Sequence, residues 1–451
     1  MNRETYLELV KNNKEYIEKV NSDPNRLKFH LMPPTGFMND PNGLYQKDGV
    51  YHIYFQYTPF NPDWGLKTWG HYTTRDMLAF KEEEPFLYPD IREDRGGVFS
   101  GSAYIAENKI HFFYTGNVSH EDAEGYDDFL VGREQNTIKV TSSDGFNIDK
   151  KQVLMRNEDY PEYMSCHVRD PKIFTKDGVY YMVLGGRTKE NRGCILMYKS
   201  LDLETFEFFD IITTKEKFGY MWECPDLFEL DGQYFLVFSP ENLDGYPRPN
   251  SNAAIMPVNF DEETCTMSKA GDLMFIDYGF DFYAPQTFLD ENNKRTILGW
   301  MRMKEVLEGE EWIGLFTMPR HLSYKDRHVY QDVHPLIKNT FVHTTDTIDF
   351  DEPFLMKTTL EDNESITLGG VKISYVDDQL VVDRTAVSVN SDDLYNIHKT
   401  PVLNGQCDLE IYYDEGIIEI FVNNGYYVVS QIIYHLKEEE THISDCTIYT
   451  R

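Results

Sequence analysis

The chain has 451 residues, of which 41% are hydrophobic and 14% are aromatic. This length favours two domains, and this apolar content is enough for packed cores and argues against intrinsic disorder. Asp and Glu number 76 against 43 Lys and Arg, so the formal net charge is −33. A surface this acidic repels phosphate backbones and anionic lipid, which argues against nucleic-acid and membrane partners.

The sequence also carries signals about its compartment. The first twenty residues are charged throughout and lack the apolar core of a secretory signal, and no later run reaches the roughly 18 apolar residues of a membrane-spanning helix. Cysteines are scattered without a C-x-x-C pair, which indicates free thiols in a reducing compartment. They are Cys166, Cys194, Cys224, Cys265, Cys407 and Cys446. Together these features predict a cytoplasmic protein.

Local patterns predict an all-β chain after a short helical start. Apolar residues from Tyr6 to Val20 recur at a roughly helical spacing, which predicts one short amphipathic helix over about 3–20. Beyond it, short aromatic and β-branched runs alternate with Gly, Asn, Asp and Pro turns, which is typical of β-strands.

An internal repeat organises the first three hundred residues. Each copy has a polar or small start, a short apolar stretch, a turn and a strongly apolar strand. The copies begin at Asn39, Ser100, Arg169, Glu223 and Tyr283, and their third residues are Pro41, Ser102, Pro171, Pro225 and Pro285. These third positions are 61, 69, 54 and 60 residues apart, and each interval leaves room for a four-stranded sheet with loops. The repeat therefore predicts a five-bladed β-propeller.

A second domain is expected after the repeats, which stop near residue 302. Residues 340–451 alternate in the manner of strands, and Asn-Asn-Gly at 423–425 between two such runs is a hairpin signal. We therefore expect a catalytic propeller over 1–335, including the helix, and a C-terminal β-sandwich over 340–451.

The repeat also predicts where carboxylates meet. In a propeller the innermost strand of every blade lines the central channel, so equivalent positions converge at one end of the axis. Asp40 and Asp170 occupy the same repeat position, and Glu223 lies one position earlier in its own copy. Because like charges raise each other's pKa, three acids in one funnel cost stability and indicate catalysis.

The chemistry that fits such acids is retaining glycoside hydrolysis, which uses two carboxyl groups about 5–5.5 Å apart, one protonated and one ionised. Apolar neighbours such as Trp222 favour Glu223 as the acid, with a raised pKa. Amide donors around Asp40 favour its ionised form and the role of nucleophile. The motifs around Asp40 and Asp170, taken one at a time, are also common turns. An active site is favoured because the acidic motifs occur together, each at nearly the same position of its repeat copy. Zinc-protease, P-loop and dinucleotide motifs do not occur, so no metal or cofactor is predicted.

Several motifs resemble, in order, those of glycoside hydrolase family 32, which contains invertases, sucrose-6-phosphate hydrolases and fructanases. They are HLMPPTGFMNDPNGL (30–44), FSGSAY (99–104), RDP (169–171), WECPDLF (222–228), DFYAPQTF (281–288), LGWM (298–301) and MPRHL (318–322). DEGIIEIFVNNGYYVVS (414–430) is similar to the family's sandwich domain. The branch most similar in these motifs is the bacterial cytoplasmic sucrose-6-phosphate hydrolases.

The resemblance implies roles for individual residues. Asp40 would attack the fructosyl anomeric carbon, Glu223 would protonate the leaving oxygen and then activate water, and Asp170 would stabilise the transition state. The substrate-binding residues that the resemblance implies are Asn39, Gln56, Trp64, Phe99, Ser100, Arg169 and Trp300. Tyr283 is added to them as an aromatic residue at a strand end.

Three readings of function follow. The first is a retaining β-fructofuranosidase acting on sucrose, sucrose 6-phosphate or short fructans. The second is a fructosyltransferase, and the third is a sugar-binding propeller without activity, against which the intact acids argue. A phosphorylated substrate would need cationic groups at the rim. The candidates by nearness to motifs are Lys67, Arg133, His167 and Arg187. A carbohydrate is the expected partner, and a homo-oligomer is compatible with the sequence.

Overall fold

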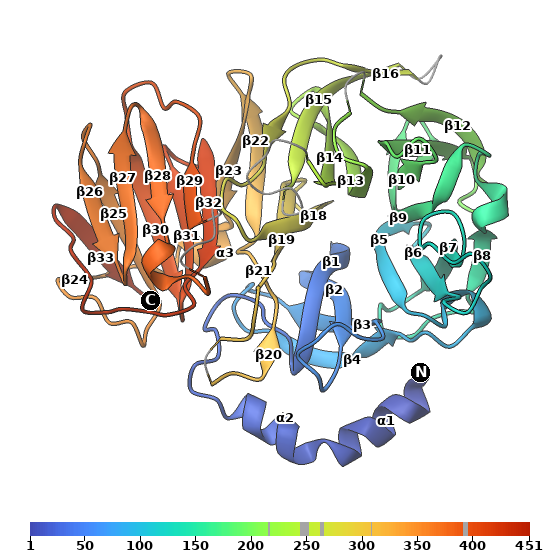
Figure 1. Ribbon diagram of the computed structural model, residues 1–451, viewed down its shortest axis with the longest axis horizontal. Coiled ribbons are helices and arrows are strands. Elements are labelled where there is room, and N and C mark those ends of the chain that lie inside the picture. The colour runs from blue at the N-terminus through green and yellow to red at the C-terminus, as the bar shows by residue number, and fades with distance from the viewer. Residues whose placement is uncertain (215–216, 244–251, 262–265, 308, 391–395) are drawn as a thin grey trace.

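Strands form almost all of the regular structure of the computed structural model, which describes residues 1–214, 217–243, 252–261, 266–307, 309–390 and 396–451. The all-β prediction is confirmed. Within these residues the strands form seven sheets, five before residue 334 and two after it. Figure 1 shows the first five sheets in a ring around a common centre, with the last two against the outside of that ring.

The ring sheets follow one another along the chain. The first, β20-β1-β2-β3-β4, contains β1 (Gly36–Lys47), β2 (Val50–Thr58), β3 (Thr68–Thr74), β4 (Lys81–Leu87) and β20 (Trp312–Ile313). The second contains β5 (Val98–Ala106), β6 (Lys109–Ser119), β7 (Arg133–Ser142) and β8 (Gln152–Met155). The third contains β9 (Met164–Lys176), β10 (Val179–Thr188), β11 (Gly193–Ser200) and β12 (Glu207–Ile212).

The other two ring sheets carry one extra short strand each. The fourth contains β13 (Met221–Leu230), β14 (Gln233–Glu241), β15 (Ala254–Asp261) and β16 (Thr266–Lys269), with β17 (Met274–Phe275) paired to β15. The fifth contains β18 (Phe282–Leu289), β19 (Arg295–Met301), β22 (Arg320–Lys325) and β23 (His328–Val333), with β21 (Leu315–Phe316) paired to β19.

Two further sheets face each other after the short helix α3 (Pro335–Lys338). One has the order β24-β33-β25-β30-β31-β32, from β24 (His343–Thr345), β33 (Cys446–Thr450), β25 (Phe354–Thr359), β30 (Asp408–Asp414), β31 (Ile417–Val422) and β32 (Tyr427–Ile432). The other contains β26 (Ser365–Leu368), β27 (Val371–Val376), β28 (Gln379–Asp383) and β29 (Ile397–Lys399). We call these two the C-terminal sheets.

The first strand of every ring sheet is irregular at the same point of the sequence repeat. The register against the next strand shifts at residues 39–40 in β1, 100 in β5, 170–171 in β9, 224–225 in β13 and 284–285 in β18. Such bulges bend a strand and re-aim its side chains, and they are frequent beside active sites. At three of them the backbone is left-handed, with φ of 64° at Asp170, 47° at Cys224 and 46° at Ala284.

The last part of the ring pairs with the first. β20 lies parallel to β1, with Trp312 opposite Gly36 and Ile313 opposite Phe37, although it follows the fifth sheet's β18 and β19 in the chain. The Trp312 indole is fully buried and donates to Glu310 Oε2 at 2.8 Å. Residues from the end of the ring therefore close it onto its beginning.

The N-terminal segment forms two helices where the sequence predicts one. They are α1 (Arg3–Asn12) and α2 (Lys14–Asn21), separated at Asn13. Asn2 caps α1 by accepting from the Thr5 N–H at 2.9 Å. Tyr6 is buried and stacks on Phe60 at 5.9 Å between centroids, which fixes α1 along the outside of the first sheet (Figure 1).

The ring and the C-terminal sheets share an apolar core. One cluster of buried residues contains Phe55 and Phe316 from the first and fifth sheets together with Tyr412, Phe421 and Val428 from β30, β31 and β32. Packing of the two parts removes apolar surface of the ring and of the C-terminal sheets from water, so each part stabilises the other.

Buried charges cross the same boundary. His30 Nδ1 lies 2.9 Å from Asp414 Oδ2, and its Nε2 lies 2.9 Å from Glu419 Oε1. Arg320 donates to Glu419 and lies 3.0 Å from Asp277. Burial disfavours the imidazolium, but the two carboxylates raise the pKa of His30 to about 9. We call these five residues the interface network.

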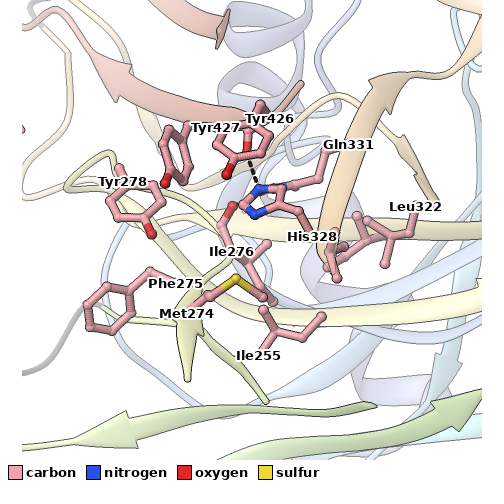
Figure 2. A pocket seen from close by; sticks show the side chains of 12 residues that line it. Ile255, Met274, Phe275, Ile276, Tyr278, Leu322, His328, Gln331, Tyr426 and Tyr427 are labelled. Carbon is pink, nitrogen blue, oxygen red and sulfur yellow. Dashed lines mark hydrogen bonds between the residues drawn. The ribbon is translucent and has the colours of Figure 1, made fainter. Parts of the chain in front are cut away.

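A small apolar cavity also lies where the ring meets β32 (Figure 2). Its volume is about 20 Å³, which is room for about one water molecule. Figure 2 shows Tyr278, Tyr426 and Tyr427 around His328, whose Nε2 lies 2.6 Å from the Tyr426 carbonyl oxygen. The cavity is therefore a packing gap and offers no space for a substrate.

The cysteines in the described residues are free, as predicted. They are Cys166, Cys194, Cys224, Cys407 and Cys446, while Cys265 lies outside the described residues. None of the described helices has the length and apolar content needed to cross a bilayer.

Candidate active site

A cavity of about 690 Å³ opens where the bulged strands of all five ring sheets meet. That volume lies in the usual range for small-molecule sites, about 300–1,000 Å³. The three predicted catalytic carboxylates, Asp40, Asp170 and Glu223, all line it. The predicted substrate-binding residues that also line it are Asn39, Gln56, Trp64, Phe99, Arg169, Tyr283 and Trp300.

The Asp40 carboxylate is held by short side-chain donors. Ser100 Oγ donates to Asp40 Oδ2 at 2.5 Å, Gln56 Nε2 to the same oxygen at 3.3 Å, and Asn39 Nδ2 to Oδ1 at 3.2 Å. Burial raises the pKa of Asp40, the Ser100 hydrogen bond opposes this rise, and the charge of Glu223 adds to it. The carboxylate is thus fixed in position while its ionised form is kept at a high free energy.

Asp170 is the most strongly perturbed acid of the cavity. Its Oδ2 accepts from the Cys224 N–H at 2.9 Å, a donor that the bulge in β13 exposes. Burial raises the pKa of Asp170 to about 8, against the opposing charge of Arg169 and with the help of Glu223 and Asp40. Since Cys224 Sγ also lies 3.5 Å from Asp40 Oδ2, one residue bridges two of the acids.

Glu223 is surrounded by donors. Arg169 Nη2 donates to Glu223 Oε1 at 2.7 Å, and the Tyr283 hydroxyl donates to Oε2 at 2.5 Å. Burial alone would favour the protonated acid, but the Arg169 charge, with hydrogen bonds from Tyr283 and Glu241, lowers the pKa of Glu223.

Glu241, at the end of β14, forms a pair with Glu223. Strand pairing sets Glu241 opposite Met221, beside Glu223, and its Oε1 accepts from Arg169 Nη2 at 3.0 Å. Burial and the charge of Glu223 raise the pKa of Glu241 to about 7. The two glutamates therefore hold one proton between them near neutral pH.

The sequence predicts a raised pKa at Glu223 and an Asp40 whose ionised form is favoured by amide donors, and both predictions are wrong for this arrangement, since the pKa of Glu223 is lowered and that of Asp40 is raised. The apolar neighbour invoked for Glu223, Trp222, points to the other side of the strand, where it stacks on Phe238 at 4.3 Å between centroids. Glu223 instead faces Arg169 and Tyr283. The proton that sequence reasoning assigned to Glu223 alone belongs to its pair with Glu241.

Several polar atoms on the cavity wall have no hydrogen-bond partner among the described residues, although they are buried. They are Asn39 Oδ1, Gln56 Oε1, Gln135 Nε2 and Trp300 Nε1. Buried polar groups are almost always satisfied, so each needs an external partner such as water or a ligand hydroxyl. A mixture of donors and acceptors beside flat aromatic faces is what a sugar binds.

Comparison with known proteins identifies the family. Residues 30–333 match the N-terminal domain of glycosyl hydrolases family 32, and residues 355–447 match the C-terminal domain of the same family. The chain belongs to glycosyl hydrolases family 32. The resemblance drawn from the motifs is thereby confirmed, and the ring and the C-terminal sheets correspond to the family's propeller and β-sandwich.

Several relatives of this family 32 chain are named sucrose-6-phosphate hydrolase. It is 34% identical over 424 residues to the sucrose-6-phosphate hydrolase of Vibrio alginolyticus, covering 88% of this chain and 84% of the relative. It is 34% identical to the Bacillus subtilis sucrose-6-phosphate hydrolase, covering 95% and 92%. The structure of sucrose-6-phosphate hydrolase from Lactobacillus gasseri superposes with a TM-score of 0.88 at 24% identity, covering 98% and 96%.

One residue expected to bind substrate in this family 32 site lies elsewhere. Ser100 is fully buried and does not line the cavity. Its hydroxyl contacts Asp40 and also accepts from Gln56. The bulge at residue 100 turns it behind the first carboxylate, so the structure places it as a support of Asp40.

Two of the cations considered for a phosphate do not fit that role, Lys67 by its position and His167 by its lack of charge. Lys67 does not line the cavity but lies under it, 3.7 Å from the Phe37 ring centroid and 4.2 Å from that of Trp64. His167 lines the cavity, but its Nδ1 lies 2.9 Å from Arg169 and its Nε2 2.6 Å from the Asp128 carbonyl oxygen. Burial, assisted by the Arg169 charge, lowers the pKa of His167 to about 4, so it is neutral.

Sequence reasoning missed Glu241, Gln135 and Tyr220, which line the same cavity. None lies in the first strand of a repeat copy. Glu241 ends a hairpin that starts beside Glu223, so a strand-pairing argument could have found it. The other two carried no signal of spacing or motif.

Among the described residues, one group of side chains has the spacing of a metal site, namely Asp290, His321 and His334. None of the three lines the cavity. His334 Nδ1 already accepts from the Leu336 N–H at 3.3 Å, which leaves the proton of the neutral ring on Nε2. That tautomer offers no lone pair to an ion, so this group does not favour metal binding.

Proposed function

We propose that the protein is a retaining β-fructofuranosidase that hydrolyses the fructosyl linkage of sucrose or its 6-phosphate. The observation that carries the proposal is the convergence of Asp40, Asp170 and Glu223 in one cavity whose wall has unsatisfied polar atoms. The family assignment and relatives named sucrose-6-phosphate hydrolases support it. Catalysis also explains why the fold keeps several buried acids together although their mutual repulsion lowers its stability.

Asp40 is the proposed nucleophile. Its carboxylate attacks the anomeric carbon of the fructosyl unit and forms a covalent ester as the bond to the leaving sugar breaks. The Ser100, Gln56 and Asn39 donors fix the attacking oxygens. The raised pKa of Asp40 means that its anion is poorly solvated and correspondingly reactive.

Glu223 is the proposed acid and base. The proton shared with Glu241 passes from Glu223 to the glycosidic oxygen, so the leaving sugar departs as a neutral alcohol. Glu223, now ionised, then takes a proton from water, whose oxygen attacks the fructosyl carbon and frees Asp40. Arg169 and Tyr283 hold Glu223 through both steps.

Asp170 and Arg169 complete the proposed site. Positive charge develops on the fructosyl ring as the bond breaks, and an acid facing the ring stabilises it. Residues with partnerless atoms, Asn39, Gln56 and Trp300, would bind sugar hydroxyls. Phe99, Trp64 and Tyr283 would supply the apolar wall.

We further propose that the five ring sheets are the five blades of a propeller, with the short N-terminal helices attached to it, and that the catalytic part spans 1–335 and the sandwich 340–451. Five successive antiparallel sheets support this division. Free cysteines support a cytoplasmic site of action.

The test is hydrolysis of sucrose and sucrose 6-phosphate by the wild-type chain and by Asp40→Asn. We expect wild-type release of both sugar products in equal amounts, and a loss of kcat of at least about a thousandfold in the variant. Circular dichroism of the variant checks that the fold is kept. A deficit of fructose relative to the other product would indicate transfer, and absence of wild-type cleavage would refute the proposal.

A further inference from the structure

The arginines that line the cavity among the described residues differ in their partners. They are Arg133, Arg169, Arg187 and Arg302. Arg169 is held by two glutamates, as described above. Arg133 lies 2.5 Å from Asp128 and donates to Asn117 Oδ1 at 3.1 Å. Both of these guanidinium groups are therefore already neutralised by protein carboxylates.

Arg187, at the end of β10, has no such carboxylate. Its guanidinium carbon lies 4.1 Å from the Phe129 ring centroid and 4.2 Å from that of Tyr220, so it is held between two aromatic rings. Its Nε donates to Asn191 Oδ1 at 2.8 Å. No carboxylate in the described part of the chain forms an ion pair with it.

The two rings fix the guanidinium without using its hydrogen-bonding edge. Cation–π contacts are made through the faces of the group, whereas its N–H bonds lie in its plane. One of the five N–H donors is used by Asn191, and the other four belong to the two terminal nitrogens. Arg187 thus presents a preorganised fork, the geometry that binds a phosphate through two parallel hydrogen bonds.

The position of Arg187 relates it to the leaving group. The Tyr220 ring stacks on it, and the Tyr220 N–H donates to the Glu241 carbonyl oxygen at 3.0 Å. The Glu241 and Glu223 carboxylates both accept from Arg169 Nη2. Glu223 is the proposed proton donor to the leaving sugar. The chain of contacts from Glu223 through Glu241 and Tyr220 therefore leads from the glycosidic oxygen outward along the leaving-sugar side.

We propose that Arg187 binds a phosphate ester on the leaving sugar and makes the site selective for the phosphorylated disaccharide over the neutral one. The inference rests on the proposed function and names the substrate class for it. The need for a dedicated cation is clear from the rest of the cavity, which Asp40, Asp170, Glu223 and Glu241 make acidic. In such a field a dianion binds only where an unshared positive charge meets it.

The experiment compares kcat/KM for sucrose 6-phosphate and for sucrose in the wild type, Arg187→Gln and Arg187→Lys. We expect a wild-type preference for the phosphorylated sugar. Arg187→Gln should lower kcat/KM for sucrose 6-phosphate by about ten- to a hundredfold and leave sucrose within about twofold. Arg187→Lys should lie between, because lysine keeps the charge and loses the fork.

Arg133→Gln is the matched control, since it removes the same charge from the same cavity at a residue already paired with Asp128. We expect it to change both substrates by the same small factor. Product inhibition of sucrose hydrolysis gives a second reading. Glucose 6-phosphate should inhibit the wild type more strongly than glucose does, and this difference should vanish in Arg187→Gln. Inorganic phosphate in the same assay separates a general anion site, which it would occupy equally well, from a subsite for the sugar ester.

Hydrolysis of sucrose by Arg187→Gln at the wild-type rate shows that the variant is folded. An equal loss on both substrates, or no loss on sucrose 6-phosphate, would overturn the inference and leave the hydrolase intact. If the wild type cleaved neither sugar, the proposed function itself would fail.

Discussion

The cavity and the interface network are both buried clusters of charge, but they are balanced differently. In the cavity, Arg169 pairs with Asp170, Glu223 and Glu241, and the fourth acid, Asp40, is held by the neutral donors Ser100, Gln56 and Asn39. In the interface network, three carboxylates, Asp277, Asp414 and Glu419, meet His30 and Arg320. The proton affinities follow that balance. Burial is overcome at Asp414 and Glu419, whose pKa values are lowered by His30 and Arg320, whereas the pKa of Asp170 is raised.

The contrast separates structure from catalysis. The interface network satisfies its charges and holds two parts of the fold together. The cavity keeps the ionised forms of Asp40 and Asp170 at a high free energy. Such perturbed acids are typical of sites where they take part in a reaction. Substitution of an acid in the cavity is therefore expected to make the folded protein more stable, and substitution in the interface network to make it less stable.

Asp170→Asn should have the largest effect on activity among the remaining variants. Loss of the carboxyl group that faces the developing cation, and can ionise as that positive charge forms, should lower kcat about 100- to 1,000-fold. The same change should raise the melting temperature at alkaline pH. The pKa of Asp170 is about 8 in the folded chain against 3.8 for the free group, so the wild type loses stability as pH rises from about 4 to 8. Asparagine has no proton to lose.

Melting temperatures measured from pH 5 to 9 test this, with kcat measured in parallel. Asp122→Asn, at an exposed acid, is the control and should change neither. A variant that melted below the wild type at pH 9 would show that Asp170 is a structural residue and would remove the contrast.

His30→Gln should have the opposite effect on stability. The pKa of His30 is about 9 when folded against 6.5 for the free group, so its contribution is fully present below pH 6.5 and is lost as pH rises through 9. The variant should lose about 3 kcal/mol of unfolding free energy at pH 6, and less at pH 9. Urea denaturation at the two pH values measures the difference.

A matched control is His120→Gln, since His120 lies 2.9 Å from Glu134 in a partly exposed ion pair. Exposed pairs contribute little, so this variant should lose less than about 0.5 kcal/mol at either pH. Equal losses from the two histidines would show that the interface network is no more stabilising than a surface pair.

Glu241→Gln should have the smallest effect on activity of these variants, and its effect should be a specific shift in the pH dependence of kcat/KM. At alkaline pH the Glu241 anion favours the proton on Glu223, and glutamine removes this help while Arg169 and Tyr283 remain. The alkaline limb of the kcat/KM profile should move down by about one pH unit. Glu121→Gln removes a charge from the same cavity wall without contacting Glu223, and its limb should stay in place. An unmoved limb in Glu241→Gln would show that the two glutamates titrate independently.

The parts of this molecule that the sequence predicts are those that recur. Asp40 and Asp170 sit at the same position of a repeat and Glu223 one position earlier, and the bulges of β1, β9 and β13 bring them to one cavity. Their pKa values could not be predicted in the same way, because those depend on which face of the strand carries each neighbour. Trp222 faces away from the cavity for that reason.

Contacts between distant, non-repeating segments escaped prediction. Glu241 reaches the site through a hairpin register, and His30 meets Asp414 across 384 residues of chain. The pairing of β20 with β1 belongs to no repeat copy. Such contacts are set by the closed ring and by the side chains that fill it, and neither is written in local periodicity.

The apolar cluster shared by the ring and the C-terminal sheets has a consequence for biosynthesis. Apart from β20, which joins the first sheet late, the ring strands pair mostly with their neighbours in the chain, so most of each sheet can form soon after it leaves the ribosome. The cluster around Phe55 and Phe316 is completed only by Phe421 and Val428, which are translated about a hundred residues after Phe316. Until then the nascent chain exposes this apolar surface to water, and the C-terminal sheets bury it once they are synthesised.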